Sequence, residues 1–88
     1  MTTTATMQVT IRYFAAARAA AGNDEETIRL IPGTTVADLV ARLGERDAKL
    51  AKVLLRCSFL CDGVAVRDLQ TALGDAQTVD VLPPFAGG

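Results

Sequence analysis

The sequence predicts an α+β fold in which a mixed β-sheet packs against one main helix. Apolar and polar residues alternate near the N-terminus, as in a strand with one buried face. Apolar residues then recur at helical spacing between residues 36 and 43, and a second alternating stretch precedes the C-terminus. The chain has 88 residues, of which 50% are hydrophobic. We therefore expect one globular domain.

The first part of the chain predicts a strand, a short helix and a second strand. The alternating stretch covers residues 7–13. Residues 14–21 are mostly alanine, the best helix former, and Gly22 supplies a residue type that commonly ends helices. Residues 27–31 have the composition of a second strand, which Pro32 terminates.

The main helix is expected to begin at Thr35. Thr35 and Asp38 have the spacing of a weak capping box, which satisfies free backbone N–H groups at a helix start. We expect Gly44 to stop or interrupt this helix, because glycine is a poor helix former. Residues 48–55 carry a second apolar set.

The remaining elements are short strands and turns. Residues 58–61 predict a third strand, and Asp62-Gly63 is a strong signal for a two-residue hairpin turn into a short strand at 64–66. Residues 69–73 are expected to form a connecting turn before the last strand at 78–82. The order of strand, strand, helix, strand, short strand and strand is typical of the β-grasp, or ubiquitin-like, fold.

Composition excludes several function classes. The net charge is −1 and no basic block is present, so we expect no nucleic-acid binding. The apolar runs are too short for a membrane span and the N-terminus does not resemble a signal peptide, so we expect a cytoplasmic protein. The chain has no histidine, the commonest general base and metal ligand. The densest acidic group includes Glu25 and Glu26, which we interpret as solvated turn and strand-edge residues rather than a metal site.

The two cysteines are interpreted as structural residues. Cys57 and Cys61 lack the spacing of a redox or zinc motif. On one strand they would share a face with Cα atoms ~13 Å apart, which is too far for a disulfide. We expect two half-buried apolar residues, with a thiol relay as the alternative.

The domain organisation is expected to be a disordered extension at 1–6, a β-grasp domain at 7–82 and an extended tail at 83–88. Two prolines cannot continue a sheet ladder, and two terminal glycines make the end thin and flexible. Fully extended, six residues reach ~20 Å, enough to enter a narrow channel in a partner. The tail residues are Pro83, Pro84, Phe85, Ala86, Gly87 and Gly88.

The expected working group is the terminal carboxylate of Gly88. A carboxylate is a poor acyl donor, and adenylation with ATP would make it reactive toward a sulfur nucleophile. The absence of Cβ atoms lets catalytic groups approach the carbonyl from either side. A frayed terminus that happens to end in two glycines is the alternative.

Three segments give the chain a family resemblance. Residues 9–15, 32–39 and 79–88 resemble the small subunit of molybdopterin synthase, and the likeness extends from Met7 to Gly88. The resemblance implies that a ubiquitin-activating-type enzyme adenylates Gly88 with ATP, and that a sulfur donor then converts it to a thiocarboxylate.

The same resemblance implies the partners and the residue roles. The carrier would dock on the large synthase subunit, which supplies the catalytic side chains, and donate sulfur to cyclic pyranopterin monophosphate. Gly88 would carry the sulfur and Gly87 would provide clearance. Residues 83–86 would line the path. No bound cofactor or metal is implied for this chain.

Other readings of the tail stay open. A sulfur carrier for thiazole or cysteine biosynthesis would share the fold and the thiocarboxylate. A ubiquitin-like modifier would join Gly88 to lysines of target proteins. A purely structural binding domain would not need Gly87 and Gly88 at all.

Overall fold

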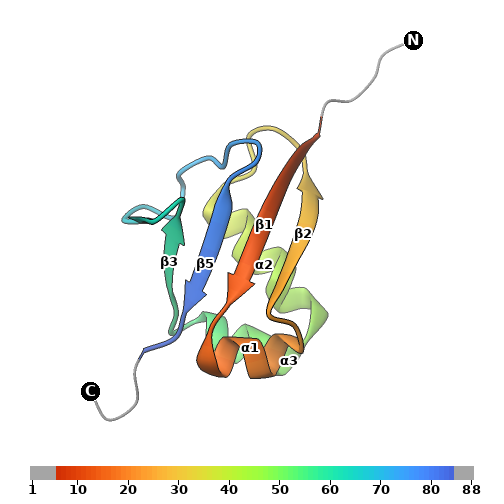
Figure 1. Cartoon of the computed structure of the whole chain (residues 1–88), viewed down its shortest axis with the longest axis vertical. Helices are drawn as coiled ribbons and strands as arrows, with labels where there is room; N and C mark the ends of the chain where they lie inside the picture. Colours follow the sequence, from red (N-terminus) through yellow and green to blue (C-terminus); the bar gives the residue numbers. More distant parts are fainter. Residues whose placement is uncertain (1–5, 85–88) are drawn as a thin grey trace.

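The fold is built on one mixed sheet of five strands. The computed structural model describes residues 6–84. The strand order is β2-β1-β5-β3-β4, in which β1 and β5 are parallel and the other neighbours are antiparallel (Figure 1). The strands are β1 (Met7–Tyr13), β2 (Glu25–Leu30), β3 (Ser58–Cys61), β4 (Val64–Ala65) and β5 (Thr78–Leu82). This is the β-grasp arrangement that the element order predicted.

A short helix, α1 (Ala15–Ala21), occupies the connection between β1 and β2. Its start is set by Phe14, whose backbone is extended, and its end by Gly22. Gly22 has φ of 79°, a left-handed conformation that glycine adopts without steric cost, and its N–H donates to the Arg18 carbonyl. The predicted helix and its stop are therefore confirmed.

The main helix, α2 (Val36–Arg46), begins with a complete capping box. The Asp38 N–H donates to Thr35 Oγ1, and the Thr35 N–H donates to the Asp38 carboxylate, both at 3.1 Å. A third helix, α3 (Ala48–Leu54), follows after Asp47, whose side chain caps its first turn.

The prediction that Gly44 stops the main helix was wrong. Helix α2 continues through Gly44 to Arg46. A Cβ atom at Gly44 would lie 3.3 Å from the Ala51 Cβ atom, so the glycine lets α2 and α3 approach closely. A glycine in a helix interior costs about 1 kcal/mol relative to alanine, and here it lies where α2 packs against α3.

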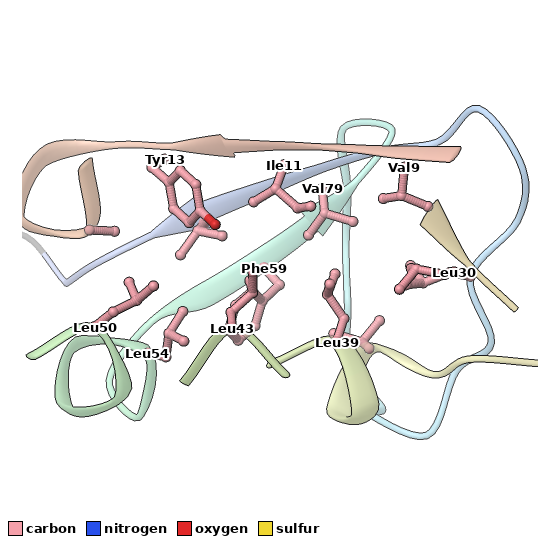
Figure 2. Packing of buried hydrophobic residues seen from close by; sticks show 14 of the residues in the cluster. Val9, Ile11, Tyr13, Leu30, Leu39, Leu43, Leu50, Leu54, Phe59 and Val79 are labelled. Atoms are coloured by element: carbon pink, nitrogen blue, oxygen red, sulfur yellow. The ribbon is translucent and has the colours of Figure 1, made fainter. Parts of the chain in front are cut away.

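The core lies between the sheet and the two helices α2 and α3. Figure 2 shows Val9, Ile11 and Tyr13 of β1 on the sheet side, facing Leu39 and Leu43 of α2. The cluster is completed by residues from α1, α3, β2, β3 and β5, and by Leu73 from the loop that precedes β5. Its fifteen buried apolar members are Met7, Val9, Ile11, Tyr13, Ala17, Leu30, Val36, Leu39, Leu43, Leu50, Leu54, Phe59, Leu73, Val79 and Val81.

The predicted hairpin turn at Asp62-Gly63 is confirmed. Both residues have positive φ, 50° and 82°, as a two-residue turn of this kind requires. The Asp62 carboxylate also accepts a hydrogen bond of 2.8 Å from the Thr78 N–H. The turn is thereby tied to the start of β5.

Two expected strands have different bounds in the structure: β2 ends at Leu30 rather than residue 31, and β4 ends at Ala65 rather than residue 66. Strand β2 starts at Glu25 rather than residue 27, because Glu25 and Glu26 pair with Arg12 and Ile11 of β1. The expected extension at residues 1–6 lies outside the described residues except for Thr6, which is exposed. None of the helices described between residues 6 and 84 is long and apolar enough to cross a membrane.

Candidate functional site at the C-terminal end of strand β5

The predicted tail follows β5, an interior strand of the sheet. Strand β5 pairs with β1 on one side and β3 on the other, and Val79 and Val81 point into the core. Backbone contacts continue to the end of the strand, where the Phe14 N–H donates to the Val81 carbonyl and Leu82 pairs with Ser58. The departure point of the tail is therefore fixed on both sides.

The sheet ladder ends at Leu82 because the next two residues are prolines. Pro83 and Pro84 have no N–H group to donate, so neither can extend the pairing. Pro83 is half-buried and Pro84 is exposed. The other predicted site residues, Phe85, Ala86, Gly87 and Gly88, lie outside the described residues.

The two prolines form one wall of a surface groove of about 590 Å³, named here the exit groove. The other walls come from the start of α1 and the end of α3. The exit groove is lined by Ala16, Lys52, Val53, Leu55, Arg56, Pro83 and Pro84. Sequence reasoning did not find this groove, because its walls come from segments far apart in the chain.

Leu55 is the most unusual residue of the exit groove. It caps the C-terminal end of α3 and is 85% exposed, although it is a large apolar side chain. Lys52 and Arg56 are exposed beside it, and neither forms an ion pair within the part of the chain that the structure describes. The groove thus combines an apolar surface with two positive charges.

A charged pair crosses the outer face of the sheet near the same end. The Arg12 guanidinium donates to both carboxylate oxygens of Asp80, from Nε at 2.6 Å and from Nη2 at 2.9 Å. These hydrogen bonds, and then the charge of Asp80, raise the pKa of Arg12 above its ordinary value. The guanidinium also lies 5.7 Å from the centre of the Phe14 ring. The arrangement holds β1 and β5 in register beside the exit of the tail.

Glu26 lies on the edge strand β2, as expected, but its side chain is only 19% exposed and is paired rather than solvated. Its carboxylate accepts hydrogen bonds from the Tyr13 hydroxyl and from Arg46, both at 2.8 Å. Burial, and then the bond to Glu26, raise the pKa of Tyr13 well above its ordinary value of 10.0. The cluster links β1, β2 and α2, so its role is structural.

The cysteines occupy positions that favour the structural interpretation. Cys61 lies in β3, but Cys57 precedes that strand, because the chain is still turning out of α3 there. The Cys57 thiol donates to the Val53 carbonyl at 3.2 Å. Both cysteines are free and half-buried, and burial raises the pKa of each thiol. A raised pKa lowers the thiolate fraction that a thiol relay requires.

A metal site and a histidine-assisted nucleophile each require a particular set of side chains. Between residues 6 and 84, no group of three or more acidic, cysteine or histidine residues could hold a metal ion. Histidine is absent from the whole sequence, so the usual partner of a serine or cysteine nucleophile is missing. The structure supplies the end of β5, paired with β1 and β3, as the point from which the last residues continue.

A family model and a known protein both match this sequence over most of its length. The model of the ThiS family matches residues 11–88. A molybdopterin synthase sulfur carrier subunit from Chlamydomonas reinhardtii is 35% identical over 83 residues, covering 93% of this chain and 100% of the relative.

Solved structures agree with this family. A Pyrococcus furiosus protein described as subunit 1 of a molybdopterin converting factor has a TM-score of 0.81 at 30% identity, covering 90% of this chain and 99% of its own. Small archaeal modifier protein 1 from Methanosarcina acetivorans has a TM-score of 0.79 at 26% identity, covering 96% and 99%. A complex of subunits 1 and 2 of molybdopterin-converting factor from Helicobacter pylori, at 24% identity with a TM-score of 0.69 and coverage of 93% and 100%, shares the fold.

The family model covers most of this chain, and the relative from Chlamydomonas reinhardtii is covered completely. The chain therefore belongs to the ThiS family, and by its sequence identity to the family of molybdopterin synthase sulfur carrier subunits.

Proposed function

We propose that this protein is a sulfur carrier of molybdenum cofactor biosynthesis. Gly88 is adenylated, converted to a thiocarboxylate, and donates its sulfur to cyclic pyranopterin monophosphate within molybdopterin synthase. The observation that carries the proposal is the 35% identity to a sulfur carrier subunit over that relative's full length. The terminal Gly87-Gly88 pair and the absence of histidine support a role in which the chain carries a group rather than catalysing its transfer.

The proposed chemistry begins at the carboxylate. A carboxylate oxygen attacks the α-phosphorus of ATP and pyrophosphate leaves, which forms an acyl adenylate. A sulfur nucleophile from a donor then attacks the carbonyl carbon and AMP leaves. After the donor bond is cleaved reductively, by a thiol for example, sulfur remains on Gly88 as a thiocarboxylate. No cofactor is bound by the carrier, because ATP is used by the activating enzyme.

Three partners follow from this proposal. They are a ubiquitin-activating-type adenylating enzyme, a sulfur donor and the large subunit of the synthase, which supplies the catalytic side chains. The Helicobacter pylori complex supports pairing with a second subunit. The contact path to the partner active sites is formed by Pro83, Pro84, Phe85, Ala86 and Gly87. We propose that all of these steps take place in the cytoplasm.

The experiment is a reconstituted molybdopterin synthesis assay with altered tails. Gly88→Ala and a variant with one added C-terminal residue are expected to fold normally and to lose sulfur transfer. Arg67→Ala is a suitable control, because Arg67 is exposed and lies outside the exit groove. An extended variant that still supports molybdopterin formation would contradict the proposal.

A second candidate function is favoured by one observation. The similarity to small archaeal modifier protein 1 extends over 96% of this chain. In that role the activated Gly88 would be joined to lysine amines of target proteins. Immunoblots of cells that express the tagged chain test it: conjugates of higher mass that disappear with Gly88→Ala would establish modification alongside or instead of sulfur transfer.

A further inference from the structure

The exit groove brings apolar side chains from separate parts of the chain together at the surface. Leu55 is 85% exposed at the end of α3, Val53 beside it is half-buried, and Pro83 and Pro84 form another wall. In Figure 1 α1, α3 and the end of β5 lie at the same end of the molecule. A single exposed leucine is ordinary on a protein surface. Here the leucine lies in a hollow with other apolar side chains, which is the form of a binding surface.

The charge at the groove is positive, although the whole chain has a net charge of −1. Both lysines of the sequence, Lys49 and Lys52, and also Arg56 lie between residues 48 and 61, a stretch that contains no aspartate or glutamate. Lys52 and Arg56 line the groove, and none of its lining residues is acidic. Neither of these two cations forms an ion pair within residues 6–84, whereas three arginines elsewhere are paired with carboxylates.

The backbone that carries these side chains is held by hydrogen bonds. The Leu55 N–H donates to the Ala51 carbonyl at 3.3 Å, and the Arg56 N–H donates to the Val53 carbonyl at 3.0 Å. The Cys57 thiol donates to the same Val53 carbonyl at 3.2 Å. A surface whose backbone is already ordered loses less conformational freedom when a partner binds.

We propose that the exit groove is a docking site for an acidic segment of a partner protein, in which carboxylates flank a large apolar side chain. The apolar side chain packs on Leu55 and Val53, and the carboxylates pair with Lys52 and Arg56. Charge complementarity selects this occupant, because a basic segment would be repelled and a purely apolar segment would gain nothing from the two cations. An anionic membrane surface fits less well, since such surfaces are bound by clusters of about four to eight Lys or Arg residues.

A consequence of this docking site rests on the proposed function. The adenylating enzyme and the large subunit act on the end of the chain, which continues from Pro84. An acidic segment of such an enzyme, once docked, holds the enzyme beside the point where the chain leaves the sheet. The encounter between the enzyme and the tail then becomes intramolecular, which raises its effective concentration.

Nuclear magnetic resonance of the labelled full chain tests the docking site, with a short synthetic peptide of glutamates around two leucines as the probe. We expect the methyl signals of Leu55 and Val53 to shift as the peptide is added, and the affinity to fall at high salt. A peptide with lysines in place of the glutamates should leave these signals unchanged. Leu55→Ser, followed at Val53, should weaken binding of the acidic peptide by roughly tenfold or more, because it removes the main apolar contact.

The two cations are tested with a pair of variants that change the net charge equally. Lys52→Glu/Arg56→Glu should weaken binding of the acidic peptide by roughly tenfold or more, because like charges then face each other. Arg29→Glu/Arg42→Glu is the matched control and should leave the affinity close to that of the wild type. Both of its arginines are exposed and outside the groove, and neither forms an ion pair in the described part of the chain.

Four outcomes would overturn the inference. The first is an acidic peptide that shifts no signal of the groove, and the second is an equal loss of affinity in the two charge-reversed variants. The third is movement of the Leu55 signals with protein concentration alone, which would assign the groove to a second copy. The fourth is movement of these signals with vesicles of anionic lipid but not with the peptide. The probe involves neither ATP nor sulfur, so failure here leaves the proposed function untouched, and loss of sulfur transfer in Gly88→Ala leaves the docking site untouched.

Discussion

Arg12 and Asp80 lie opposite each other on the parallel strands β1 and β5, joined by two hydrogen bonds across the outer face of the sheet. The Asp80 side chain is only 9% exposed, whereas that of Arg12 is 48% exposed. The pair is therefore asymmetric: the arginine can be solvated without its partner, but the carboxylate cannot. This asymmetry gives a prediction for each residue.

Arg12→Met should destabilise the protein, because it leaves a nearly buried carboxylate without its charged partner. We expect the Tm to fall by roughly 5 °C or more for a domain of this size. The double variant Arg12→Met/Asp80→Val should recover most of the loss, since it removes the unpaired charge as well. Thermal unfolding followed by circular dichroism measures all three proteins.

The control for this prediction is Arg18→Met. It breaks the longer contact of 3.7 Å between Arg18 and Asp24, whose side chains are both well exposed. Such a pair should change Tm by no more than about 2 °C. Equal losses for Arg12→Met and Arg18→Met would mean that the burial of Asp80 does not matter.

Gly44→Val should destabilise the contact between α2 and α3. Its Cβ atom would meet the Ala51 Cβ atom at 3.3 Å, and the two methyl groups of valine add further volume at this close contact. Overpacking of this kind typically costs roughly 1–3 kcal/mol in the free energy of unfolding. Urea unfolding measures it. Ala41→Gly and Ala41→Val on the exposed side of α2 form the control pair, because the difference between them gives the glycine-to-valine change in helix propensity. A Gly44→Val variant whose stability changes only by that difference would contradict the account of Gly44.

The stability of the protein should fall with rising pH above the ordinary pKa of tyrosine. Folding raises the pKa of Tyr13, so the folded state holds the hydroxyl proton more tightly than the unfolded chain. The contribution of this proton to the free energy of unfolding is fully present below about pH 10. It is lost as the pH rises through the pKa of Tyr13 in the unfolded chain toward its pKa in the folded protein. Tyr13→Phe should be less stable by roughly 1–2 kcal/mol at neutral pH and should have a flatter profile.

Tyr13 is the chain's single tyrosine, so its ionisation can be read directly from ultraviolet absorbance. The folded protein should show tyrosinate absorbance only at a pH well above 10, and the urea-unfolded protein near 10. Coincident titrations in the two states would refute the prediction.

Phe85→Ala should weaken binding to the large synthase subunit. Loss of the apolar burial of one aromatic side chain costs roughly 1–3 kcal/mol. Calorimetric titration with the purified large subunit measures it, and an unchanged affinity would remove Phe85 from the interface.

Much of the fold could be predicted because the signals are local. The alternation of residues 7–13, the capping pair Thr35 and Asp38, and the turn Asp62-Gly63 depend only on neighbouring residues, and all three are confirmed. Gly44 was misread because its reason is a contact with Ala51 on another helix. Periodicity along one segment carries no information about such a contact.

The candidate site likewise has one part that local sequence predicts and other parts that depend on tertiary packing. The departure of the tail at Pro83 and Pro84 could be predicted from proline chemistry, and the structure places both at the end of β5. The exit groove could not, because Ala16, Leu55 and Pro83 meet only after the sheet and helices have packed. The ion pair of Arg12 with Asp80 was missed for a related reason, since it depends on the parallel register of β1 and β5.

The measurement that tests the central claim most directly is an intact mass spectrum of the purified protein. The sample is first incubated with ATP, the cognate adenylating enzyme and a sulfur donor. The account predicts a mass gain that matches the exchange of one oxygen for sulfur, located on the peptide that ends in Gly88. An unchanged mass with an enzyme known to be active would contradict the assignment as a sulfur carrier.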